Sequence, residues 1–214
     1  MLGYAIKCLT KPFSFGDAMF AGEEFVTLIS ALVLLAASSI KYARTKEVSY
    51  FMFIISSISF LVIAAALAFL KLGALSLPIT PYVGALYPAF MASGVLGKDH
   101  WKKYTIFTVL MLILMLIGSF YKPLLTIAEV TLHSISGIII IFLPLLMVIQ
   151  RKAPATESLI GLGGLLISVG GLALATLIMQ KPILPLETVL FLLHPLLFLS
   201  ALLMSAGIYM RKRS

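Results

Sequence analysis

Two histidines within long apolar runs are the residues of this sequence best placed to do chemistry. His133 lies 11 residues after Lys122, and His194 lies 13 residues after Lys181. An ionisable side chain inside hydrocarbon is costly, so each histidine is a candidate functional residue. At about 1.5 Å of helix per residue, the spacing places both imidazoles at nearly the same depth. Two neutral imidazoles at one depth suit the two faces of a haem iron, so the pair predicts one bound haem b.

Two glutamates and a glycine share helical faces with these histidines. Glu129 is four residues before His133, Gly137 is four residues after it, and Glu187 is seven residues before His194. These spacings place each carboxylate on the face of its histidine, and Gly137 leaves room for a porphyrin ring. With a haem bound, the carboxylates would accept protons from a quinol, which makes a quinone a predicted partner. Without a haem, the same groups predict a cluster that relays protons, binds a metal ion or binds a polar substrate.

Structural roles explain the same residues in simpler terms. A histidine in a membrane helix commonly forms a hydrogen bond to a neighbouring helix. Glu187 lies near the expected start of a helix, where a carboxylate interacts favourably with the helix dipole. The glycine-rich run at 161–171 is typical of a surface on which helices pack closely.

Composition and charge pattern indicate the elements that must position these side chains. The 214 residues are 61% hydrophobic and only 11% charged, whereas soluble domains are roughly a quarter charged. Apolar runs of about 18 residues or more separate the charges, which is the length that a helix needs to cross hydrocarbon. The sequence therefore predicts an all-α, multi-pass protein of a cell membrane. Seven transmembrane helices are expected, at 22–42, 49–71, 74–97, 103–121, 123–150, 157–180 and 183–210.

Basic residues in the loops predict the orientation of the chain. Eleven of the 16 Lys and Arg residues fall on one side of the expected spans, which should be the cytoplasmic side. This places the N-terminus outside and the C-terminus in the cytoplasm. The same topology accounts for the net charge of +8 without a nucleic-acid partner. The eleven are Lys41, Arg44, Lys46, Lys98, Lys102, Lys103, Arg151, Lys152, Arg211, Lys212 and Arg213.

An internal repeat divides the chain. Residues 26–30 resemble residues 130–134, and the pair Tyr87-Pro88 resembles His194-Pro195 at a similar offset. The matches predict two parallel three-helix units, at 21–97 and 122–214, joined by a linker helix at 98–121. Residues 1–20 precede them as an expected interfacial segment. The repeat makes Tyr87 the counterpart of His194 and adds it to Glu129 and Glu187 as a candidate proton or substrate site.

Three functional hypotheses follow from these residues. The first is an integral membrane subunit that binds haem b through His133 and His194 and exchanges electrons with a quinone or a partner subunit. The second is a transporter of a small solute or ion, with the substrate passing between the two three-helix units. The third is a non-catalytic accessory subunit of a membrane complex, in which the histidines only hold helices together.

Overall fold

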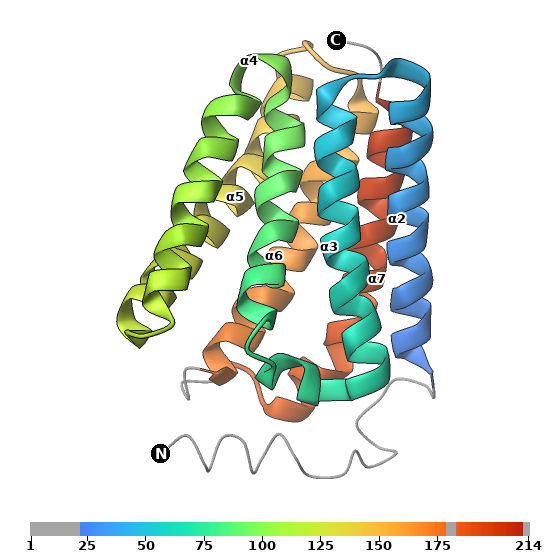
Figure 1. The fold of residues 1–214 in the computed structure, drawn as a ribbon. Coiled ribbons are helices and arrows are strands. Elements are labelled where there is room, and N and C mark those ends of the chain that lie inside the picture. The colour runs from blue at the N-terminus through green and yellow to red at the C-terminus, as the bar shows by residue number, and fades with distance from the viewer. Residues whose placement is uncertain (1–21, 179–182, 212–214) are drawn as a thin grey trace.

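The computed structural model describes residues 22–178 and 183–211, and over these ranges the chain is helical without strands (Figure 1). The expected interfacial segment at 1–20 lies outside the described residues. Six described helices are long and apolar enough to cross a membrane, which indicates a multi-pass membrane protein. The elements are α2 (Glu23–Thr45), α3 (Val48–Leu70), η1 (Lys71–Ser76), α4 (Thr80–Gly118), α5 (Lys122–Ile149), η2 (Ala155–Glu157), α6 (Ser158–Ile178) and α7 (Leu186–Met210).

Proline and glycine set several helix boundaries. Gly22, at φ 87°, directly precedes α2, and α4 carries a proline in its first two positions. Proline suits a helix start because its missing N–H is not needed there. The third expected span, 74–97, therefore begins as helix only at Thr80, after a short 3₁₀ segment over Lys71–Ser76.

Helix α4 folds back on itself at Gly97. This residue has φ 68° and ψ −160°, which are not helical values. The Ser93 and Thr105 hydroxyl oxygens lie 3.5 Å apart, although 12 residues of straight helix would span about 18 Å. The Tyr82 hydroxyl also donates to the carbonyl of Met115 at 3.3 Å. The two parts of α4, residues 80–96 and 98–118, therefore run antiparallel (Figure 1).

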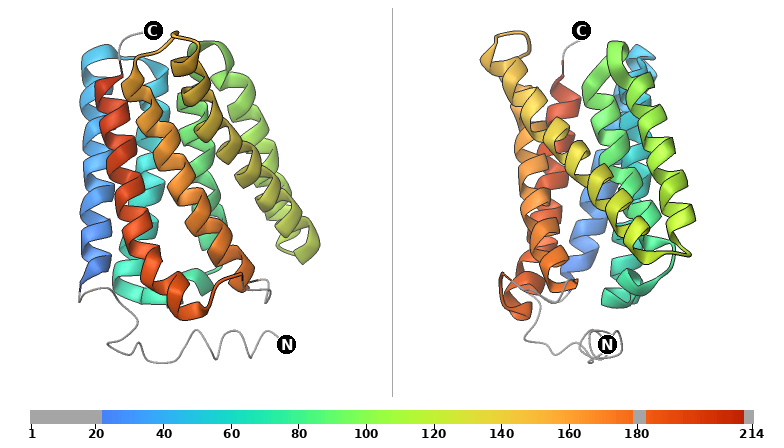
Figure 2. Two further views of the ribbon diagram at one scale, coloured as in Figure 1. Left: turned by 180° about the vertical axis from the view of Figure 1, so that it is seen from behind. Right: turned by 90° about the vertical axis from the view of Figure 1, so that its left-hand side faces the viewer.

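The helices form a closed ring. Each of α3 to α7 packs against the preceding helix, and α2 packs against α7. Contacts from Thr27 to His194 and from Lys41 to Arg211 show that α2 and α7 run parallel. We call the end at which α2 and α7 begin the Glu23 end, and the end at which they finish the Arg211 end. Figure 2 shows the ring from two further sides, with α5 diverging from α6 toward the Glu23 end.

Large side chains fill the middle of the ring. The rings of Phe60 and Tyr87 stack with their centroids 4.9 Å apart, and the Tyr87 hydroxyl donates to the sulfur of Met204 at 3.3 Å. These contacts join α3, α4 and α7. Large apolar side chains such as Phe69 on α3 and Ile106 on α4 are instead exposed, as expected for helices that face lipid.

The glycines of α6 serve helix packing. A Cβ atom at Gly161 would lie 2.7 Å from the carbonyl oxygen of Ile141 on α5, and one at Gly163 would lie 2.8 Å from the carbonyl oxygen of Ser200 on α7. Small residues let membrane helices approach this closely. At these positions the packing interpretation of the glycine-rich run is confirmed.

The backbone conformation of Gly97 generates a stability prediction. Its φ and ψ lie in a region that is essentially restricted to glycine, so Gly97→Ala should destabilise the fold by about 1–3 kcal/mol. The strain is in the backbone, since the nearest atom to an added Cβ is the Ser49 hydroxyl oxygen at 3.7 Å. Thermal unfolding of the purified protein in detergent measures the effect.

Gly84→Ala in the same helix is the matched control. No atom lies within 4 Å of a Cβ added at Gly84, and alanine favours helix over glycine by about 0.5–1 kcal/mol. We expect this variant to be as stable as the parent protein or slightly more stable. Equal unfolding temperatures for the two variants would contradict the role of Gly97 as a glycine-specific turn.

Candidate functional site at the Glu23 end

The contact between α7 and α2 defines the position of His194. The side chain of His194 is partly buried, and its Nδ1 lies 3.2 Å from the hydroxyl oxygen of Thr27. The same hydroxyl lies 3.4 Å from the carbonyl oxygen of His194 and 3.3 Å from that of Glu23. His194 is thereby held against α2.

The direction in which the Thr27 hydroxyl donates its hydrogen depends on which nitrogen of the His194 imidazole carries the proton. A hydroxyl has one hydrogen to donate, and neutral imidazole has one N–H donor and one acceptor nitrogen. When Thr27 donates to a backbone carbonyl, it can accept the hydrogen bond of an Nδ1–H group. When it donates to Nδ1, the imidazole proton must be on Nε2. A hydroxyl rotation therefore accompanies a change of tautomer, which is the property a proton-relay residue needs.

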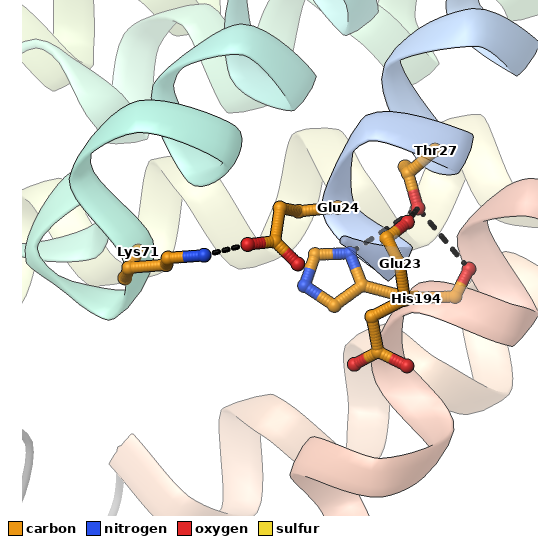
Figure 3. Close-up of polar contacts among 5 residues, drawn as sticks. All are labelled: Glu23, Glu24, Thr27, Lys71 and His194. Atoms are coloured by element: carbon orange, nitrogen blue, oxygen red, sulfur yellow. Dashed lines mark hydrogen bonds and ion pairs between the residues drawn. The ribbon is translucent and has the colours of Figure 1, made fainter. Parts of the chain in front are cut away.

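Two buried carboxylates lie beside this histidine. Glu23 and Glu24 form the first turn of α2 and are 2% and 8% exposed. The Glu24 carboxylate forms an ion pair with Lys71, which begins η1 and whose side chain is about half exposed. Figure 3 shows the Glu24 carboxylate between Lys71 and the imidazole ring. The group therefore extends from water at Lys71 to the partly buried His194.

The composition of this group indicates the ligands that it can hold. Two carboxylates, one ammonium group and one imidazole make up the described part of this group. Negative oxygen ligands of this kind attract small cations and protons. Both carboxylates lie at the N-terminus of α2, where the helix dipole interacts favourably with negative charge. The residues come from α2, η1 and α7, so a ligand bound here would be sensitive to the relative positions of all three.

The structure places His133 apart from this group. His133 lies on an exposed face of α5, with Nδ1 3.0 Å from the carbonyl oxygen of Glu129. Gly137, one turn further along, faces α6, where a Cβ would lie 3.6 Å from the Ser168 hydroxyl oxygen. Helix α6 packs against both α5 and α7. The His133 imidazole thus contacts a carbonyl of its own helix α5, whereas the His194 imidazole contacts α2.

The other predicted site residues lie in two further environments. Glu187 is exposed in the first turn of α7, the position expected for a carboxylate that interacts with the helix dipole. Tyr87 is 6% exposed within the packed middle of the ring. Its side chain contacts Phe60 and Met204.

Sequence reasoning missed Glu23, Glu24, Thr27 and Lys71 as neighbours of His194. Two adjacent acids at the start of an apolar run were the available signal, but they also fit an ordinary helix start. The ring closure that brings α2 against α7 is a long-range contact. No local spacing in the sequence encodes it.

Comparisons of the chain with protein-family models, with curated proteins and with solved structures find no match.

Proposed function

We propose that the chain crosses the membrane seven times, with the Glu23 end outside and the Arg211 end in the cytoplasm. Each half of α4 then counts as one crossing. The hydrogen bond from Tyr82 to Met115 supports this, because it requires the second half of α4 to return along the first. The distribution of basic residues supports the orientation, since most of them lie at the Arg211 end.

The parallel course of α2 and α7 gives independent support. If each of the six long helices crossed once in alternating directions, the first and last would be antiparallel. The contacts from Thr27 to His194 and from Lys41 to Arg211 require them to be parallel. One additional crossing within α4 removes this conflict.

Cysteine labelling tests this topology in a Cys8→Ala background. We expect single cysteines at the exposed positions Ser76 and Lys122 to react with an impermeant maleimide added from outside. A cysteine at exposed Lys102 should react only from the cytoplasmic side. A single crossing by α4 would place Ser76 and Lys122 on opposite sides of the membrane, and that result would overturn the proposal.

We propose further that the protein transports a small cation or protons through the group of Glu23, Glu24, Thr27, Lys71 and His194. The main support for this proposal is that two adjacent carboxylates are buried beside His194, which forms a hydrogen bond with Thr27 on another helix. Buried ionisable groups in membrane helices are costly and typically mark ion or proton pathways. The half-exposed side chain of Lys71 gives this group access to the outer solution.

The packed middle of the ring supports a carrier over an open channel. Phe60, Tyr87 and Met91 are almost completely buried between the helices, so no water-filled path is expected to connect the two ends in this conformation. A solute bound at the Glu23 end could then be released to the cytoplasm only after the helices rearrange. Alternation of this kind is how transporters built from helical units move their substrates.

Uptake into proteoliposomes tests the transport proposal. We expect the purified protein to take up sodium, potassium or protons down an imposed gradient, followed by ion-sensitive dyes. Glu24→Gln should reduce the rate about tenfold, as expected from the loss of one contact with a charged group. Glu187→Gln, a change of an exposed carboxylate at the same end, should leave the rate unchanged. Uptake no faster than in protein-free liposomes would reject the proposal.

Haem binding is a second candidate function, and the contact made by Nδ1 of His133 supports it. This Nδ1 lies within hydrogen-bond distance of a backbone carbonyl oxygen, which leaves Nε2 available to a ligand. This is the arrangement that commonly orients imidazoles bound to metals. His194 is similarly held through Nδ1 by Thr27. We therefore retain the hypothesis of a haem b subunit in electron transfer, with a quinone or a partner subunit as the redox partner.

Absorbance spectra test the haem hypothesis directly. The oxidised and dithionite-reduced protein should show a Soret band and a reduced α-band that are lost in both His133→Ala and His194→Ala. The control His100→Ala changes an exposed histidine at the Arg211 end and should keep the bands. A folded protein that stays colourless after haem addition would reject haem binding. If uptake is also absent, the accessory-subunit hypothesis becomes the leading one.

A further inference from the structure

A second charged group lies at the Arg211 end of the same two helices. The side chains of Arg211 and Glu157 are 8% and 7% exposed, and Nε of Arg211 lies 3.5 Å from a carboxylate oxygen of Glu157. The guanidinium group also donates to the carbonyl of Gly94 at 3.2 Å. Lys41, from α2, donates to the carbonyl of Arg211. This group joins α2, α4 and α7 to η2.

Stability does not explain why this ion pair is buried. Removing two charges from water costs several kcal/mol for each ion, and replacing a buried ion pair by apolar residues is often neutral or stabilising. The contact between Arg211 and Glu157 is long and joins one atom of each side chain. A contact of this kind is better suited to opening and closing than to stabilisation alone.

The elements that carry the two charges can move without unfolding a membrane helix. Arg211 lies just beyond α7 with extended backbone angles, and Glu157 belongs to the three-residue segment η2. Gly94, whose carbonyl accepts the hydrogen bond from Arg211, lies three residues before the turn at Gly97. A Cβ atom added at Gly94 would lie 2.4 Å from the ring of Phe53. The Arg211 guanidinium lies over that same ring, 5.9 Å from its centroid. Arg211 thus covers the place where α3, α4 and α7 meet.

We infer that Arg211 and Glu157 form a cytoplasmic gate, which closes the Arg211 end of the bundle to water while the ion pair is intact. This inference rests on the proposed transport function and adds its regulation at the opposite end. Opening separates Arg211 from Glu157 and Gly94 and admits water between α7 and the first half of α4. The outer group and the gate share α2 and α7, so movement of these helices affects both.

Accessibility of a buried position on α7, near the Arg211 end, tests this inference. Ser205 is 4% exposed and lies six residues before Arg211 on α7. In the Cys8→Ala background, Ser205→Cys should react slowly with an impermeant maleimide added from the cytoplasmic side. Glu157→Gln leaves the buried Arg211 charge without its carboxylate, so labelling should become on the order of tenfold faster. The charge-swapped variant Glu157→Arg with Arg211→Glu should recover part of the protection.

Two further variants keep the test decisive. Lys152→Gln changes an exposed charge in the loop before η2 and should leave labelling of Ser205→Cys unchanged. The apolar pair Glu157→Leu with Arg211→Met should remain folded and label more slowly than the parent protein, because no charge draws water into the closed gate. Labelling that is equal in Glu157→Gln and Lys152→Gln, or fast in the apolar pair, would overturn the gate.

The labelling needs no substrate, so it separates the gate from the transport proposal. If Glu157→Gln speeds labelling but the protein shows no uptake, the gate is supported and transport is rejected as its purpose. Uptake with labelling that is insensitive to Glu157→Gln would support transport and exclude this ion pair as the gate.

Discussion

Hydrocarbon cannot solvate a charge, and this constraint determines where the bundle places its ionisable side chains. Glu23 and Glu24 lie at the start of α2, where Lys71 and water are within reach. Arg211 lies at the end of α7, beside Glu157. Between these two levels, the buried side chains that the structure describes are apolar or carry hydroxyl groups. Two hydrogen bonds, from Thr27 to His194 and from Lys41 to the carbonyl of Arg211, join α2 to α7 at these two levels.

The adjacency of α2 and α7 depends in turn on the turn at Gly97. Because α4 reverses direction there, α5, α6 and α7 continue around the ring, and α7 reaches α2 in a parallel orientation. A straight α4 would deliver α7 with its direction inverted, and His194 could not then lie beside Thr27 while Arg211 lies beside Lys41. One backbone conformation accessible mainly to glycine thus decides which side chains meet at either end.

The sequence predicted that the chain is built of long apolar helices, but it did not predict which of them are in contact. Long apolar runs and clustered charges predicted helices that cross a membrane, because length and hydropathy are local properties. The neighbour of His194 was not predictable in this way. The apparent repeat suggested proximity to the helix of His133, whereas the structure places His194 against α2. Association of membrane helices depends on close packing and individual hydrogen bonds of small net energy, and a single sequence carries little information on such differences.

The two charged ends lie too far apart to influence one another through charge alone. Glu24 and Lys41 on α2, like His194 and Arg211 on α7, are separated by 17 residues, or about 26 Å of helix. At an effective dielectric constant of about 20, two unit charges at that distance interact by about 0.6 kcal/mol. The ion-pair partners of Glu24 and Arg211 reduce this further. The communication that the proposed gate requires must therefore be mechanical, and the parallel pair of α2 and α7, in polar contact at both ends, is the part of the fold able to carry it.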